Sequence, residues 1–191
     1  MPPPIHFSIF PTSIGACGIA WGQGGILALQ LPEAHETQTR SRLLRAQPDA
    51  LPGTASSHLQ RVMDDIVALL EGEGRDLRHA VLDMTGLSAF QRRVYELTRT
   101  IEPGQTLSYG EVAALCGDVR AARAVGQALG RNPFPIIVPC HRVLAAGGQS
   151  GGFSAHGGVT TKLRLLHLEG ALGAPATRES VAAQRSFALS F

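Results

Sequence analysis

Three short, largely apolar segments near the start of the chain, the first of which alternates apolar and polar residues, constrain the fold more than any other feature. The segments cover residues 5–10, 15–21 and 26–31, and breaks that are rich in glycine or contain proline separate them. A period of two is typical of β-strands, and short turns between consecutive strands favour antiparallel pairing. The chain is therefore predicted to begin with an antiparallel meander, whose first strand ends at the break over residues 11–13.

The residues that follow predict a scaffold around this sheet. Residues 40–45 fit a short helix, and residues 58–71 carry apolar side chains on one face of a longer helix. Residues 48–57 are rich in Pro, Gly, Ala and Ser and are expected to form a loop, whereas residues 77–84 fit a further strand. We expect an N-terminal α/β scaffold domain over residues 1–85, without chemistry of its own.

The second half of the chain is predicted to be mostly helical. Ser88 can cap a helix over residues 89–101. Two short helices over residues 109–116 and 120–130, joined by a turn that contains glycine, have the outline of a helix-turn-helix. Residues 160–170 fit a closing helix.

The two halves differ in charge. Residues 1–85 carry a net charge of −3 and residues 86–170 one of +4, within an overall net charge of +2. A basic C-terminal half favours a polyanionic partner, and an ordinary solvated surface is the alternative explanation. We expect a second domain over residues 86–170, followed by a flexible tail over residues 171–191.

Composition and cysteine usage exclude several classes of protein. No apolar stretch is long enough to cross a bilayer, and the N-terminus lacks the pattern of a secretory signal, so we expect a cytoplasmic protein. Three widely spaced cysteines without a CxxC pair argue against a disulfide framework and against a zinc site. Cys17 and Cys116 are expected to be structural, and no metal is expected.

The third cysteine stands in the motif that most directly indicates chemistry. In residues 139–143 a proline precedes Cys140, and His141 follows it. A thiolate is a strong nucleophile whose population a neighbouring base raises, and the proline stiffens the turn that carries it. A buried cysteine beside a structural histidine would give the same pair, so the dipeptide alone does not decide.

The flanking segments decide, because residues 86–170 closely resemble the O6-alkylguanine-DNA alkyltransferases, also called methylated-DNA–protein-cysteine methyltransferases. Seven ordered segments carry the resemblance: residues 90–95, 108–113, 122–126, 132–133, 138–143, 151–154 and 165–170. The resemblance implies an α+β fold. An N-terminal antiparallel sheet with helices, in a ribonuclease-H-like layout, would precede a mostly helical domain similar to a winged helix-turn-helix.

The resemblance also implies a DNA repair protein that reacts once. It would flip O6-alkylguanine out of double-stranded DNA and transfer the alkyl group, irreversibly and stoichiometrically, to Cys140. His141 would take the thiol proton through a bound water, Glu169 would orient and stabilise the imidazole, and Asn132 would brace the cysteine loop. Residues 86–170 would thus bind DNA and accept the alkyl group, as a monomer with no cofactor and no obligate protein partner.

A second set of residues would handle the DNA. The implied role of Arg123 is to enter the base stack and fill the gap left by the flipped nucleotide. Small side chains near it would let the helix enter the minor groove, namely Ala121, Ala122, Ala124 and Gly126. Close helix packing is the alternative explanation of these small residues.

The remaining predicted contacts surround the flipped base. Tyr109 would help to rotate the nucleotide, the carbonyl of Val143 would accept from the guanine amino group, and Ser154 would donate toward O6. Phe153 stands where many members carry tyrosine, so it would stack on the base without a hydroxyl contact. Residues 155–156 lengthen this loop, which we expect to admit bulkier alkyl groups. The ratio of rates on O6-benzyl- and O6-methylguanine, with and without these two residues, tests that expectation.

Three other classes of protein share part of the pattern. A recognition protein that binds alkylated guanine without reacting would lack the acceptor cysteine, which is present here as Cys140. A helix-turn-helix regulator would need long polar side chains where the second helix has small ones. A cysteine hydrolase would use Cys140 and His141 but would leave Arg123 unexplained.

Overall fold

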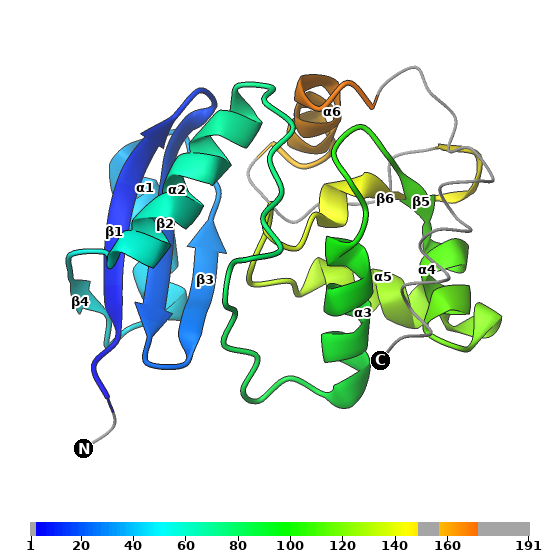
Figure 1. Ribbon diagram of the computed structural model, residues 1–191, viewed down its shortest axis with the longest axis horizontal. Helices are drawn as coiled ribbons and strands as arrows, with labels where there is room; N and C mark the ends of the chain where they lie inside the picture. The colour runs from blue at the N-terminus through cyan, green and yellow to red at the C-terminus, as the bar shows by residue number, and fades with distance from the viewer. Residues whose placement is uncertain (1–2, 149–156, 172–191) are drawn as a thin grey trace. The chain divides into compact units, whose positions relative to one another are not determined.

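The computed structural model describes residues 3–148 and 157–171 (Figure 1). These residues divide into two compact units. The first comprises the chain up to Gly86 together with residues 133–137, and the second begins at Leu87 and contains the rest. The fold is α+β, as the sequence predicts. None of the helices in the described ranges is both long and apolar enough to span a bilayer.

The first unit is built on a four-stranded sheet in the order β3-β2-β1-β4. Strands β1 (His6–Thr12), β2 (Gly15–Gly22) and β3 (Gly25–Gln30) form the predicted antiparallel meander. The short strand β4 (Leu51–Pro52) pairs with β1 in parallel. The prediction of an antiparallel sheet is therefore corrected to a mixed sheet, because part of the expected loop over residues 48–57 adds a parallel strand.

Strand β1 also extends further than predicted. It runs through Pro11, which lies opposite Ala16 of β2. A proline removes a ladder donor and is tolerated where a strand lacks a neighbour on one side. Here β4 pairs only with His6 and Phe7, so the far end of β1 has a partner strand on one side only.

Two helices cover the sheet. In the view of Figure 1, α2 (Ser57–Leu70) crosses in front of the sheet and α1 (Glu36–Ala46) lies behind it. The side chain of Ser56 caps α2 by accepting from the backbone N–H of Leu59. The predicted apolar face of α2 is buried, and its members are Leu59, Val62, Met63, Ile66, Leu69 and Leu70.

The strand predicted over residues 77–84 is wrong. This segment makes only an isolated bridge to β3, in which Ile26 N–H donates to Val81 O at 2.9 Å and Asp83 N–H donates to Ile26 O at 2.8 Å. Val81 is 56% exposed, so the apolar residues of this segment are not all buried. Further along β3, Leu29 N–H donates to Pro133 O at 2.8 Å.

The second unit is mostly helical. Its helices are α3 (Ala89–Arg99), α4 (Tyr109–Leu115), α5 (Ala122–Gly130) and α6 (Val159–Leu168). Ser88 and Ser108 each begin a helix with a reciprocal capping box, so the predicted cap at Ser88 is confirmed.

The predicted pair of short helices is confirmed in α4 and α5. The chain turns at Gly117, whose φ of +101° suits glycine, and passes through a 3-10 turn, η1 (Val119–Ala121), into α5. A two-stranded parallel sheet joins β5 (Leu107–Ser108), directly before α4, to β6 (Val143–Leu144). This pairing brings the start of α4 beside the segment that follows the Cys-His pair.

Candidate active site around Cys140

Cys140 lies in a tight turn between a proline and strand β6. The turn is a single 3-10 helix, η2 (Cys140–Arg142), which follows Pro139. The backbone N–H of Cys140 donates to Val138 O at 2.7 Å, and that of Arg142 donates to Pro139 O at 2.9 Å. Cys140 is buried with 9% of its surface exposed, so the thiol is held in a defined and nearly closed position.

The imidazole of His141 is bound to a carboxylate at the end of α6. Nε2 of His141 lies 2.9 Å from Oε1 of Glu169, and both side chains are at least 96% buried. Nδ1 of His141 is also buried and has no hydrogen-bond partner among the described residues. The carboxylate therefore assigns the proton to Nε2, which leaves Nδ1 as an open acceptor.

The ionisation states of these three groups follow from burial and from their neighbours. Burial raises the pKa of the Cys140 thiol, although a hydrogen bond from Asn132 and the charge of Lys162 act in the opposite direction. Burial lowers the pKa of His141. Burial alone would raise the pKa of Glu169, but His141 and Arg142 outweigh it and lower the value to about 2. The resting site thus combines a thiol, a neutral imidazole and a carboxylate.

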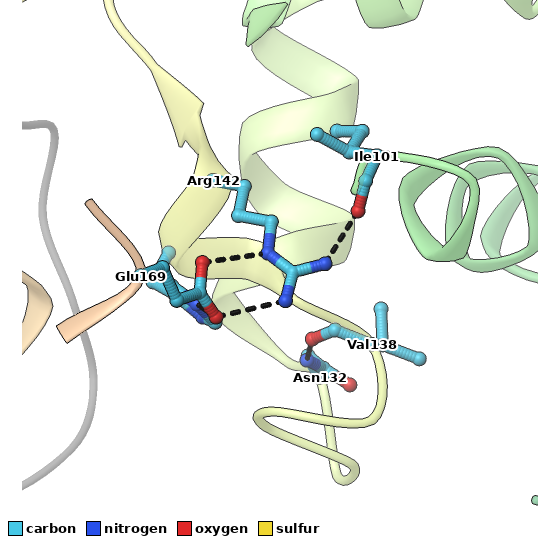
Figure 2. Close-up of polar contacts among 6 residues, drawn as sticks. Ile101, Asn132, Val138, Arg142 and Glu169 are labelled. Atoms are coloured by element: carbon cyan, nitrogen blue, oxygen red, sulfur yellow. Dashed lines mark hydrogen bonds and ion pairs between the residues drawn. The ribbon is translucent and has the colours of Figure 1, made fainter. Parts of the chain in front are cut away.

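Asn132 fixes the backbone just before Cys140. It follows the end of α5, and its Nδ2 donates to Val138 O at 2.9 Å, as Figure 2 shows. A hydrogen bond from the same side chain to Cys140 acts to lower the pKa of the thiol, which favours the thiolate. One side chain therefore contacts both the backbone of the cysteine turn and its nucleophile.

Lys162 is a residue of this site that the sequence reasoning missed. It is fully buried on α6, where it donates to Val143 O at 2.6 Å and lies 5.8 Å from the ring centroid of Tyr109. The neighbouring Leu163, although apolar, is 39% exposed. The available signal was spacing, because Lys162 precedes the buried Leu165 and Leu166 by three and four residues.

The small residues at the start of α5 are half-buried or exposed. The core-facing residues of this helix are Val125, Ala128 and Leu129, whereas Arg123 and Ala124 are exposed. The half-buried members of the predicted small face are Ala121, Ala122 and Gly126. A Cβ at Gly126 would make only an ordinary contact with the ring of Tyr109, at 3.8 Å, so close packing does not require glycine at this position.

Tyr109 stands at the first position of α4, between α5 and Lys162. Its side chain is half-buried, and burial together with the nearby Cys140 raises the pKa of its hydroxyl. The structure thus brings Tyr109, Val143 and Cys140 together around Lys162. The predicted contacts of Phe153 and Ser154, and the loop extension at residues 155–156, lie outside the described residues.

The other two cysteines lie elsewhere. Cys17 is fully buried in β2, and burial raises its pKa to about 12, which makes it an inert thiol. Cys116 ends α4, and burial raises its pKa as well. In the part of the chain that the structure describes, no three His, Cys, Asp or Glu side chains gather as metal ligands would.

The protein is expected to lose stability in acid through this site. An unfolded chain protonates His141 below its ordinary pKa of 6.5 and Glu169 below 4.5, whereas the folded site resists both protonations. The lowered carboxyl pKa therefore contributes about 3 kcal/mol above pH 4.5, which is lost as the pH falls toward 2. Urea unfolding across this range measures the loss.

The matched variants are Glu169→Gln at the site and Glu96→Gln on the exposed side of α3. Glu169→Gln should reduce the loss of stability below pH 4.5, to which Asp76 and Asp83 still contribute, and Glu96→Gln should retain the full loss. Identical acid profiles for the wild type and Glu169→Gln would contradict this prediction.

The sequence and the fold are both similar to those of known proteins. Residues 89–171, which contain Cys140, His141 and Glu169, match the family model described as the 6-O-methylguanine DNA methyltransferase, DNA binding domain. The methylated-DNA–protein-cysteine methyltransferase of Methanothermobacter thermautotrophicus is 38% identical over 153 residues, which cover 80% of this chain and 78% of that protein.

Two further relatives bear on the interaction with DNA. The DNA base-flipping protein of Thermus thermophilus is 44% identical over 112 residues, which cover 59% of this chain and 74% of that protein. The crystal structure of Mycobacterium tuberculosis OGT in complex with DNA is similar with a TM-score of 0.66 and 33% identity. That match covers 97% of this chain and 99% of the other.

Proposed function

The chain belongs to the family of methylated-DNA–protein-cysteine methyltransferases, and on this premise we propose that it repairs DNA by moving the alkyl group of O6-alkylguanine onto Sγ of Cys140. The observation that carries the proposal is the buried thiol of Cys140 next to His141, whose imidazole is held by Glu169. A soft, shielded nucleophile with a base beside it suits attack on an alkyl carbon.

The proposed reaction balances without a cofactor. The sulfur–carbon bond forms as the carbon–O6 bond breaks, and the electron pair of the broken bond leaves with the guanine. The thiol proton passes to Nδ1 of His141 through a water and ends on the guanine, which has one more proton than its O6-alkyl form. The product is a thioether on Cys140. Because a thiolate is a poor leaving group from a thioether, the alkyl group stays on Cys140 and each molecule reacts once.

The partner in this proposal is double-stranded DNA, approached from the minor groove. O6 of a stacked guanine is out of reach of a buried thiol, so the nucleotide has to leave the duplex. The exposed Ala124 on α5 supports this step, because a narrow groove admits a helix only where its side chains are small. Arg123 then fills the space that the flipped nucleotide leaves.

Replacing Arg123 with alanine should slow repair of duplex DNA far more than reaction with free O6-benzylguanine. The free base needs no flipping, so only the duplex reaction depends on the inserted side chain. Single-turnover rates on the two substrates measure the difference. Arg120→Ala is the matched control, because the Arg120 side chain is 89% exposed and its loss removes the same charge. Equal losses on both substrates for Arg123→Ala would refute the proposed role.

The proposed function is tested by intact mass spectrometry of the wild-type protein before and after incubation with an oligonucleotide that contains O6-methylguanine. We expect one added methyl group per molecule, mapped to the peptide that carries Cys140. An unchanged mass with tight binding to the damaged DNA would overturn the proposal. It would place the protein with the recognition proteins that bind alkylated guanine without reacting.

A further inference from the structure

The guanidinium of Arg142 is buried and all three of its nitrogens are engaged. Nε donates to Oε2 of Glu169 at 2.8 Å, Nη2 donates to Oε1 at 2.8 Å, and Nη1 donates to the carbonyl of Ile101 (Figure 2). The Arg142 and Glu169 side chains are 6% and 4% exposed. Bidentate geometry of this kind fixes both partners and is far stronger than a surface ion pair.

Arg142 and His141 compete for the same carboxylate oxygen. Oε1 of Glu169 lies 2.8 Å from Nη2 of Arg142 and 2.9 Å from Nε2 of His141. With a neutral His141, the three side chains carry no net charge. With a protonated His141, they would carry one uncompensated positive charge in a buried site, which is costly.

We propose that Arg142 is a positioning residue that keeps His141 a neutral base, with its proton on Nε2 and Nδ1 open, by occupying both oxygens of Glu169. This inference rests on the proposed function, because a proton-accepting His141 matters only if the Cys140 thiol reacts. Without Arg142, the carboxylate would face the imidazole alone and form a neutral ion pair with its protonated form.

Three charged side chains around His141 shift its pKa, namely Glu169, Arg142 and Lys162. Burial is the largest cause of the lowered pKa of His141, and the charges of Arg142 and Lys162 lower it further. Among these groups, only Glu169 raises the pKa of His141. Cys140 is a neutral thiol at rest, because burial raises its pKa. Arg142 therefore offsets the one group that would otherwise protonate the base.

A neutral His141 should let alkyl transfer proceed at lower pH than it would without Arg142. A neutral imidazole can take the thiol proton, whereas an imidazolium formed in advance cannot. If Arg142 lowers the pH at which His141 is protonated, its removal should move the acid limb of the transfer rate toward neutral pH. A residue that only stabilised the fold would lower the rate without moving this limb.

The test is an NMR titration of the ring nitrogens of His141 in the full-length protein. His141→Gln identifies the signal among the seven histidines. In the wild type we expect a neutral ring at pH 7 with the proton on Nε2. In Arg142→Met the pKa of His141 should rise by about 1–3 units, and in Arg142→Lys, which keeps the charge but loses the fork, by less.

The rate of alkyl transfer across about pH 5 to about pH 9 is the second readout, and its acid limb should move in parallel with the titration. A wild-type His141 that is protonated at pH 7 would overturn the inference even if Arg142→Met failed to fold. So would an unmoved titration in Arg142→Met. Alkyl transfer by the wild type is scored separately by mass, so failure of the proposed function remains distinguishable from failure of this inference.

Discussion

Substitution of Cys140 by serine is expected to abolish alkyl transfer while leaving the affinity for DNA unchanged. A serine hydroxyl is close to a thiol in size, so the tight turn η2 should keep its geometry. It is a far weaker nucleophile toward an alkyl carbon and is not ionised near neutral pH. Because Cys140 is buried and uncharged at rest, its loss removes no contact with phosphates.

Intact mass and fluorescence anisotropy on the same oligonucleotide measure both expectations for Cys140→Ser. The matched control is Cys116→Ser at the end of α4, which should still gain one alkyl group. An alkyl group on the Cys140→Ser protein would show that another side chain is the acceptor. A loss of binding would show that the turn, and not only its nucleophile, had changed.

Substitution of Glu169 by alanine is expected to cause the largest loss of stability at the site, about 3–5 kcal/mol. The carboxylate accepts three hydrogen bonds from Arg142 and His141, and its removal leaves a buried guanidinium without a counter-charge. Transfer should fall as well, because the imidazole loses the partner that sets its tautomer.

Urea unfolding at neutral pH measures the stability of Glu169→Ala, with Glu96→Ala as the control. Glu96 is exposed on α3, and its substitution should stay within about 0.5 kcal/mol of the wild type. A Glu169→Ala protein as stable as this control would contradict the view that the carboxylate compensates a buried positive charge.

The parts of the fold that the sequence predicts correctly depend on local signals. The cap at Ser88 and the buried face of α2 are each decided within one or two helical turns. Glycine-containing turns likewise define the three-stranded meander and the pair α4 and α5. In each case the residues that form the contact are close in sequence, so the local sequence pattern is enough to predict the structure.

The predictions that fail depend on contacts between distant residues. Strand β4 exists because two residues pair with the start of β1, and the segment around Leu82 makes one bridge where the sequence predicts a strand. Lys162 is a lysine in an apolar register, and the carbonyl of Val143 to which it donates lies 19 residues away in the sequence. No local pattern contains either contact.

The residues of the candidate site also fall into those that the sequence points to and those that only the structure identifies. The motif around Cys140 and its resemblance to a family directed attention to His141, Glu169 and Asn132, whose roles stay predictions. The proposed role of Arg142 could not be inferred from its position after His141, because its partner Glu169 lies 27 residues away in the sequence. The side chains of His141, Arg142 and Glu169 are all buried, so their charges have to compensate one another. This burial arises only when the second unit is folded.

The grouping of residues 133–137 with the first unit limits how this protein can be divided into modules. The chain leaves the second unit after Asn132, contributes the buried Phe134, Ile136 and Ile137 to the first, and returns at Val138, two residues before the nucleophile. Ile136 has a φ of +72°, a strained value for a branched side chain that its packing has to maintain. A chimera assembled from two homologues would therefore need three crossover points: one near residue 86 and two that keep this five-residue insert with the N-terminal parent.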